Sequence, residues 1–251
     1  EALDGGDPGK NVEFRDALYT LDFPFTSSPK LITKTKDRFA GVFWGNDQYA
    51  MVSSQWYDTR NVKTFLINPS SGASKLINDR NSQDIYNDPG DVFRARNNFG
   101  TYPMYIQNDK VFLIGKGFTK EGEFPFVDEL DLKSLKKKRL YTAKKSDLQE
   151  RIIQLIDPKT GDMMVSLQSA SVFPNYFTKN IKTGKQKALT QLKNPFTNLE
   201  KVHKEILNYK RKDGVDLSGT LYLPADYDFK NKEKLPLLIW AYPREYKDKN
   251  T

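Results

Sequence analysis

Four segments of this chain repeat one pattern, in which an Asp or Asn precedes a short polar turn and then a Leu-containing strand. The anchoring residues are Asp22, Asn68, Asp131 and Asn180, and they are separated by 46, 63 and 49 residues. Repeats of about 40–50 residues, each with room for four strands, are typical of the blades of a β-propeller. The repeat therefore predicts a modular, mainly β architecture for residues 1–198.

The other strands of each repeat can also be assigned. The strands expected to line the central channel are Phe39–Trp44, Tyr102–Ile106 and Arg151–Ile156. The second and third strands of the units are expected at Tyr49–Val52, Lys110–Ile114, Asp162–Leu167, Val62–Ile67, Pro125–Leu130 and Tyr176–Ile181. A β-sandwich with a similar number of strands is the alternative. Three concordant units favour a partial β-propeller, with about three four-stranded blades plus part of an earlier blade.

The C-terminal residues depart from this repeat. A charged turn at Lys210–Gly214 precedes a segment in which Leu217, Gly219, Leu221 and Leu223 alternate with other residues, which is typical of a strand. The run Leu235–Ala241 is almost continuously apolar, as in a strand buried on both faces of an α/β sheet. These two segments predict the start of a second, mixed sheet that the remaining residues do not complete.

Three motifs around this change resemble the propeller-to-hydrolase junction of the prolyl oligopeptidase family of serine peptidases, and the glutamyl endopeptidase-like branch resembles them most. The motifs are Arg211–Gly214, Leu221–Pro224 and Trp240–Pro243, with weaker upstream matches at Tyr86–Gly90 and Gly100–Tyr102. The resemblance implies that residues 1–198 are the C-terminal portion of a β-propeller. Residues 199–251 would be a linker and the N-terminal strands of a truncated α/β-hydrolase domain, with the polar segment Leu192–Lys204 as the connector.

Composition excludes several classes of function. The chain has 251 residues with no Cys and one His, which excludes disulfides and thiolate metal sites and argues against a His-based metal site. No apolar run of about 18 residues is present, so no membrane span is expected. The chain begins at Glu1 without a Met or a signal peptide, which suggests a segment of a longer protein. A periplasmic or secreted location suits a scavenging peptidase, although no residue indicates the compartment.

The net charge of +8 comes from 40 basic and 32 acidic residues, so the surface is mixed rather than polycationic. The basic runs Lys136–Arg139 and Lys144–Lys145 invite a nucleic-acid interpretation. They lack any accompanying nucleic-acid-binding motif and lie at an expected outer strand. We therefore interpret them as a solvated turn and expect no nucleic-acid partner.

The catalytic groups of a serine peptidase are not apparent in this chain. There is no Gly-x-Ser-x-Gly nucleophile elbow, and the only imidazole, His203, is expected in the connector. The chain alone is therefore expected to be inactive. The resemblance implies that a Ser, an Asp and a His would follow Thr251 in an intact enzyme, whose mechanism requires no metal or organic cofactor.

Tyr242 is the one candidate catalytic residue. It follows the apolar run Leu235–Ala241, and α/β sheets place ligand sites beyond the carboxyl ends of their strands. A phenol there can donate a proton to a developing oxyanion. In the family that Trp240–Pro243 resembles, the Tyr at the matching position supplies an oxyanion-hole hydroxyl. The alternative is a tyrosine that only packs against the end of a strand.

Arg94 and Arg96 are the candidate substrate-binding residues. They lie in the long connection Asn78–Gly100, and loops of this length are often functional. A guanidinium matches a carboxylate in bidentate geometry. The resemblance to glutamyl endopeptidases implies acidic substrate side chains, which these arginines would read. The alternative is ordinary salt bridging within a charged loop.

These observations predict a non-catalytic fragment of a serine peptidase, whose propeller gates access and helps to bind peptide substrates. Cleavage after Glu is what the resembling branch implies. The alternative is a non-enzymatic propeller that serves as a protein-interaction scaffold, and a third possibility is a basic propeller that binds polyanions. Three blades do not close a ring, so we also expect self-association through unpaired strand edges.

Overall fold

The computed structural model describes residues 1–231 and 234–241. The chain is mainly β, with antiparallel pairing throughout the sheets of this part of the chain. The first sheet contains β3 (Arg38–Trp44), β4 (Ala50–Trp56), β5 (Asn61–Ile67) and β6 (Ser74–Asn81). The second contains β7 (Asp91–Val92), β8 (Lys110–Gly115), β11 (Phe126–Asp131) and β12 (Lys137–Thr142). The third contains β13 (Gln149–Asp157), β14 (Asp162–Gln168), β15 (Asn175–Asn180) and β16 (Gln186–Ala188).

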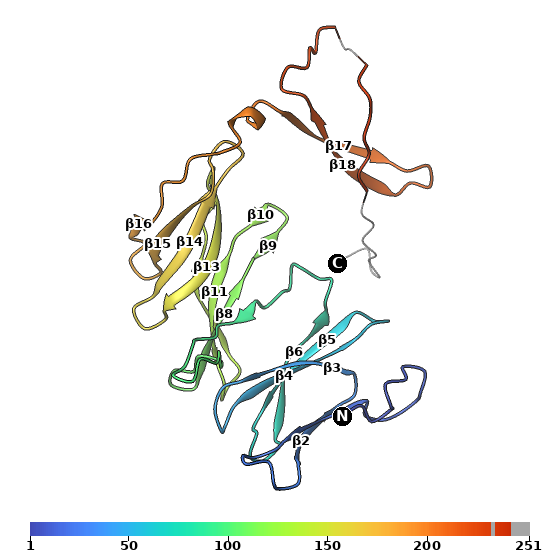
Figure 1. Cartoon of the computed structure of the whole chain (residues 1–251), viewed down its shortest axis with the longest axis vertical. Coiled ribbons are helices and arrows are strands. Elements are labelled where there is room, and N and C mark those ends of the chain that lie inside the picture. The colour runs from blue at the N-terminus through green and yellow to red at the C-terminus, as the bar shows by residue number, and fades with distance from the viewer. Residues whose placement is uncertain (232–233, 242–251) are drawn as a thin grey trace.

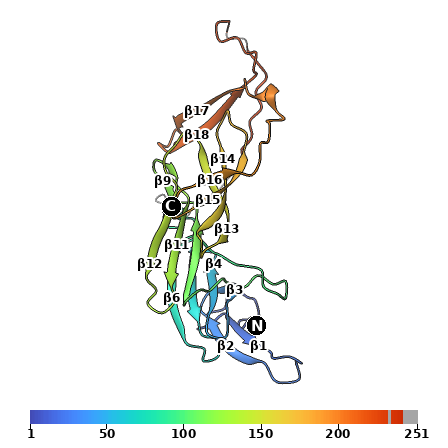
Figure 2. The same cartoon turned by 90° about the vertical axis from the view of Figure 1, so that its left-hand side faces the viewer.

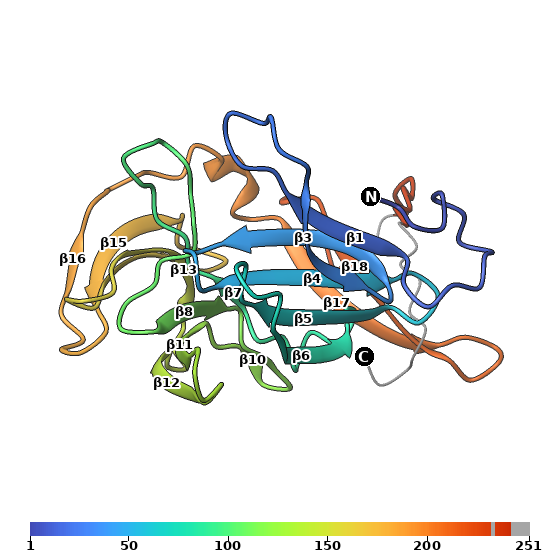
Figure 3. The same cartoon turned by 90° about the horizontal axis from the view of Figure 1, so that it is seen from below.

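Short two-stranded pairs accompany these sheets. The hairpin of β1 (Asp16–Thr20) and β2 (Lys30–Thr35) precedes the first sheet, and β9 (Phe118–Thr119) and β10 (Gly122–Glu123) form a hairpin between β8 and β11. The 3-10 helix η1 (Thr197–Leu199) leads to a final hairpin of β17 (His203–Lys210) and β18 (Asp216–Leu223). The three main sheets succeed one another along the long axis of the molecule (Figures 1 and 2). Figure 3 shows β3 to β6 side by side in chain order.

The repeated turn found in the sequence has one hydrogen-bonding pattern in all three main sheets. The Asn68 side-chain oxygen accepts bonds from the backbone N–H groups of Ser70 and Ser71, at 3.0 and 2.9 Å. Asp131 and Asn180 accept the corresponding bonds in the second and third sheets. This local bonding favours a turn over continued strand. Asp22 differs, because its carboxylate instead binds Lys30 Nζ at 2.7 Å.

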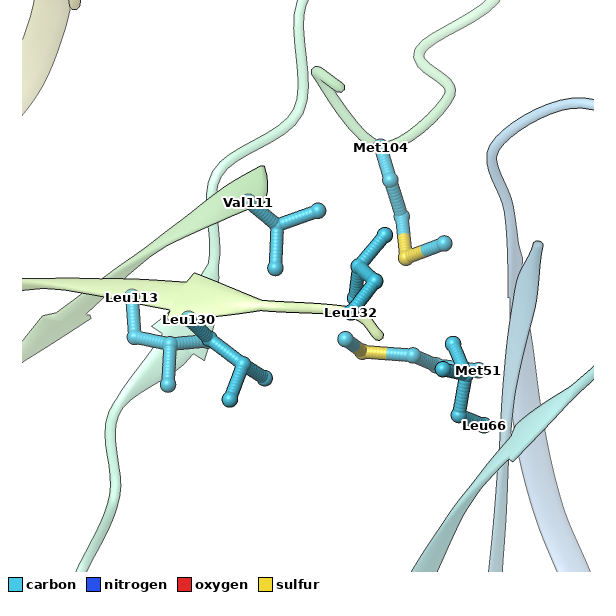
Figure 4. Close-up of a cluster of buried hydrophobic side chains, with 7 residues drawn as sticks. All are labelled: Met51, Leu66, Met104, Val111, Leu113, Leu130 and Leu132. Atoms are coloured by element: carbon cyan, nitrogen blue, oxygen red, sulfur yellow. The ribbon is translucent and has the colours of Figure 1, made fainter. Parts of the chain in front are cut away.

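Apolar side chains pack each sheet against the next one in the chain. Between the first and second sheets, Met51 and Leu66 meet a cluster that includes Val111, Leu130 and Leu132 (Figure 4). Between the second and third sheets the buried residues are Phe93, Phe112, Val127, Leu155, Met163 and Val165. Full burial of such a side chain contributes about 1.5–3 kcal/mol. The core is thus a series of interfaces between consecutive sheets.

Two clusters of Tyr, carboxylate and Lys add polar links at these same interfaces. Tyr49 donates to Asp109 at 3.1 Å, and Lys133 pairs with the same carboxylate at 2.6 Å. Tyr141 of β12 donates to Glu150 of β13 at 2.6 Å, and Lys179 binds its other oxygen at 2.6 Å. Burial and the neighbouring Glu150 carboxylate both raise the pKa of Tyr141, so its hydroxyl stays a hydrogen-bond donor at neutral pH.

The predicted arrangement of several four-stranded units is confirmed, but one predicted inner strand is wrong. Tyr102–Ile106 is not a strand of the second sheet; the short β7 pairs with β8 in its place. The backbone N–H of Met104 donates to the Trp44 carbonyl at 2.7 Å, and that of Tyr105 donates to the Phe93 carbonyl at 3.0 Å. These bonds attach the segment to the end of β3 and to the chain after β7, so it cannot pair with β8.

The C-terminal predictions have mixed outcomes. The alternating segment forms β18, and the charged turn before it closes with Gly214 at φ 88° and Arg211 bound to Asp213. Leu235–Ala241, predicted as a buried strand, lies outside every described sheet, and Leu238 is 92% exposed. An apolar strand of this type needs neighbours on both edges and cover on both faces. The described residues place none of these around it, so the start of a hydrolase sheet is not seen.

Candidate functional site

A cleft of about 710 Å³ lies between the second and third sheets. One wall comes from β7 and the two residues after it, together with the end of β8, and the opposite wall comes from β13. Val92, Ile152 and Ile153 contribute apolar surface, and Tyr102 contributes an exposed ring. Ligand-binding clefts commonly measure about 300–1,000 Å³. The cleft is large enough for a short stretch of peptide.

The cleft is lined by more basic than acidic side chains. Arg94, Lys116 and Arg151 line it, together with the carboxylates Asp91 and Glu123. Within residues 1–231 and 234–241, none of the three cations forms a salt bridge within 4 Å. The Glu123 carboxylate accepts a bond from Gln149 Nε2 at 3.3 Å. The site therefore presents cations that are free to meet an anionic group.

Arg94 is held at the cleft by both its backbone and its ring neighbour. Its backbone forms an isolated antiparallel bridge with Met104, whose N–H is bound to the end of β3. Its guanidinium lies 4.9 Å from the centre of the Phe43 ring, a cation–π distance. The predicted site residue therefore sits where the first and second sheets meet, with its side chain exposed.

Arg96 lies two residues further on and is also exposed, but it does not line this cleft. It precedes a tight turn in which the Asn97 side-chain oxygen accepts from the backbone N–H groups of Phe99 and Thr101, each at 3.0 Å. Gly100 has φ 79° in this turn. The two predicted arginines thus share a loop, and Arg94 alone of the pair lines the cleft.

Tyr242, the predicted oxyanion donor, lies outside the described residues. His203, predicted in the connector, is instead the first residue of β17. Its Nε2 is 3.5 Å from Glu205 Oε2, and its ring centre is 4.9 Å from that of Phe229. Ser70 lies in the turn that follows Asn68, and Ser218 lies in β18.

The basic run Lys136–Arg139 begins one residue before β12, the outer strand of the second sheet, and Lys144–Lys145 follows that strand. Arg139 binds Asp128 and covers the Phe126 ring at 3.9 Å. In the described part of the chain, no three His, Asp or Glu side chains gather as a metal-binding group. None of its helices is long and apolar enough to cross a membrane.

Sequence reasoning missed Lys116 and Arg151 as site residues. Arg151 begins the segment Arg151–Ile156 that was predicted to line the channel, and the structure places it in β13 at the cleft. A cation on an inner strand was therefore a usable signal. Lys116 follows β8 and carries no comparable signal, because its place at the cleft depends on how two sheets pack.

The chain contains repeated four-stranded meanders that pack face to face, with a cation-lined cleft between two of them. This arrangement defines a β-repeat region suited to binding ligands between its units. No protein-family model matches the chain. A probable chloroplastic glutamyl endopeptidase of Oryza sativa subsp. japonica is 33% identical over 267 residues. One from Arabidopsis thaliana is 34% identical over 268 residues. The chain is homologous over its whole length to these glutamyl endopeptidases, and its resemblance to that branch of the prolyl oligopeptidase family is confirmed.

Both alignments cover 100% of this chain, which spans 28% of the length of either relative. Among solved structures, oligopeptidase B from Trypanosoma brucei aligns with a TM-score of 0.46 and 11% sequence identity. That alignment covers 80% of this chain and 34% of the oligopeptidase chain.

Proposed function

We propose that this chain is the propeller part of a glutamyl endopeptidase-like serine peptidase, together with the start of its hydrolase domain. The observation that carries the proposal is homology along the entire chain to two probable glutamyl endopeptidases. The three consecutive four-stranded sheets support it, since such meanders are the units from which propellers are built. The propeller would limit access to the active site and help to bind peptide substrates.

Within this proposal, Arg94 and Arg96 read acidic side chains of the substrate. The position of Arg94 at a peptide-sized cleft, with no carboxylate partner among the described residues, supports its role. Arg96 is exposed on the same loop and is available to a ligand that approaches the turn. Tyr242 would donate a hydrogen bond to the oxyanion of the tetrahedral intermediate. Serine, aspartate and histidine from the rest of the protein would complete the site.

The test is to determine the reading frame beyond Thr251 and to assay the protein that it encodes. We expect a Gly-x-Ser-x-Gly elbow followed by Asp and His, and cleavage of peptides after Glu in preference to Gln. A continuation without a nucleophile elbow would instead favour the non-enzymatic interaction scaffold. In an active enzyme, Arg96→Glu should abolish the preference for Glu, and its persistence would remove Arg96 from the substrate site.

Tyr242 has a separate kinetic test in the same enzyme. Loss of one oxyanion-hole donor lowers kcat by about 10²–10³-fold, so Tyr242→Phe should have an effect of that order while KM changes little. Tyr209→Phe is the matched control, because Tyr209 is 55% exposed on β17. An unchanged kcat in Tyr242→Phe would show that this tyrosine only packs.

A further inference from the structure

The arginines of this chain differ in whether they meet a carboxylate. Several arginines in the described part of the chain each form a salt bridge with an Asp, namely Arg15, Arg38, Arg80, Arg139 and Arg211. Arg94 and Arg151 form none with any described residue, yet they line one cleft from two different sheets. Guanidinium groups match carboxylates in bidentate geometry. Two such groups at one cleft, neither with a carboxylate partner among the described residues, indicate a site for an external anion.

Lys116 adds a third cation from the end of β8. The cleft's own carboxylates, Asp91 and Glu123, do not offset all three charges. Glu123 is also engaged by Gln149, whose side-chain oxygen in turn accepts from Gln168 Nε2 at 3.0 Å. The excess of positive charge favours a ligand with a single carboxylate over a neutral one.

The wall beside Arg151 is apolar. The pairing of β13 with β14 is irregular between Ile152 and Gln154, and Arg151, Ile152 and Ile153 all line the cleft, so a cation lies beside two aliphatic residues there. Ile153 is 45% exposed and lines the cleft. A carboxylate on a peptide that also carries an apolar group fits this combination of a cation and aliphatic side chains.

We propose that Arg94, Lys116 and Arg151 form a subsite that binds a carboxylate of a peptide, with Lys116 and Arg151 as specificity-determining residues. This inference rests on the proposed function, because it assigns the acidic part of a peptide substrate to this cleft. The carboxylate is that of an acidic side chain or of the C-terminus of the peptide. Both supply the same planar anion.

The test is binding of short peptides to this 251-residue chain at low salt, followed by amide shifts in 15N–1H NMR spectra. One probe is an N-acetylated, C-amidated tripeptide with a central glutamate. A second has glutamine in its place and is neutral. A third has the central glutamine and a free C-terminal carboxylate. We expect at least one of the two carboxylate peptides to bind more tightly than the neutral peptide, and the peptide that does so identifies the source.

Arg151→Gln and Lys116→Gln should each weaken binding of that peptide by about threefold to tenfold. Arg151→Lys should bind better than Arg151→Gln, because it retains the charge. Matched controls are Arg211→Gln in the β17–β18 turn and Lys187→Gln on β16, both exposed and away from the cleft. Circular dichroism of each variant verifies that the fold is retained.

Three results would overturn the inference: equal binding of the neutral peptide, no binding of either carboxylate peptide, or unchanged binding in both Arg151→Gln and Lys116→Gln. These outcomes are separable from failure of the proposed function. A longer protein without peptidase activity would refute that function and leave a positive binding result intact. If the longer protein is a Glu-directed peptidase and its Arg151→Gln and Lys116→Gln variants still prefer Glu, only the assignment of the carboxylate subsite to this cleft would be refuted.

Discussion

At the scale of single residues, Asp4 is the most deeply buried charged residue in the described part of the chain. Its side chain is fully buried between two guanidinium groups, with Arg15 at 2.9 Å and Arg38 at 2.7 Å. Arg38 also binds Asp16 of β1, so this cluster ties the N-terminal segment to the start of the first sheet. The hydrogen bond from Arg38 is the main cause that lowers the pKa of Asp4 from 3.8 to about 2.

This shift predicts how the free energy of unfolding depends on pH. Because the pKa of Asp4 is lower in the folded state, its stabilising contribution is complete above about pH 4 and is lost as the pH falls towards 2. The Asp4→Asn variant has no ionisable side chain at this position, so it lacks this pH-dependent contribution. Its denaturant midpoint should therefore fall less steeply than that of the unsubstituted chain between pH 4 and pH 2. Equal slopes in the two proteins would contradict the shift.

At the scale of elements, the hairpin turns that close the three main sheets need a left-handed residue four positions after the anchor. Gly72 and Gly184 occupy this position with φ 71° and 70°, and Leu135 occupies it with φ 57°. The two glycines differ in their surroundings. A Cβ on Gly72 would lie 2.8 Å from the Ile32 carbonyl oxygen, whereas a Cβ on Gly184 would meet nothing within 4 Å.

These surroundings predict different costs for the same substitution. Gly184→Ala should lower the free energy of unfolding by about 1 kcal/mol, from conformational strain alone. Gly72→Ala should cost more, because the clash with the Ile32 carbonyl adds to that strain. Gly41→Ala is the control, since Gly41 lies in β3 with open space around it and no positive φ. Urea unfolding of the three variants tests the order, and equal midpoints for Gly72→Ala and Gly184→Ala would contradict it.

The elements also show what the sequence allowed us to predict. The turns at Asn68, Asp131 and Asn180 were predictable because one side chain and its next few neighbours determine them. The two-residue β7 was not, because the segment predicted in its place, Tyr102–Ile106, is bound instead to the distant Trp44 carbonyl and to the Phe93 carbonyl. Arg94 stood out within a long loop, but its cleft exists only once two sheets pack. Leu235–Ala241 has the composition of a strand, but no strand among the described residues pairs with it.

At the scale of the whole molecule, the main sheets stack in one series. The apolar clusters join the β1–β2 hairpin to the first sheet, the first sheet to the second, and the second to the third. In the described residues no buried cluster joins the first sheet to the third. The outermost strands β6, β12 and β16 each have one hydrogen-bonded neighbour, so each leaves an edge that no described strand pairs with. Such edges favour pairing with another chain.

We therefore predict that this chain self-associates when it is purified alone. Sedimentation velocity should show an average mass that rises with protein concentration. Lys substitutions at two exposed positions on β16, Gln186→Lys and Ala188→Lys, should reduce this rise if that edge is used, since charge on an edge strand opposes pairing. Thr183→Lys, in the turn between β15 and β16, serves as the control. A stable monomer across all concentrations would argue against open edges.

The chain-order pairing within each sheet has a consequence for biosynthesis. Every strand of the first sheet lies between Arg38 and Asn81, so its hydrogen bonds close only short loops, whose entropic cost is small. A growing polypeptide can therefore assemble this sheet before the second one has been translated. Met51 and Leu66 would still lack their apolar neighbours at that stage. We expect the chain to fold stepwise during translation, with each newly synthesised sheet burying the exposed apolar face of the sheet before it.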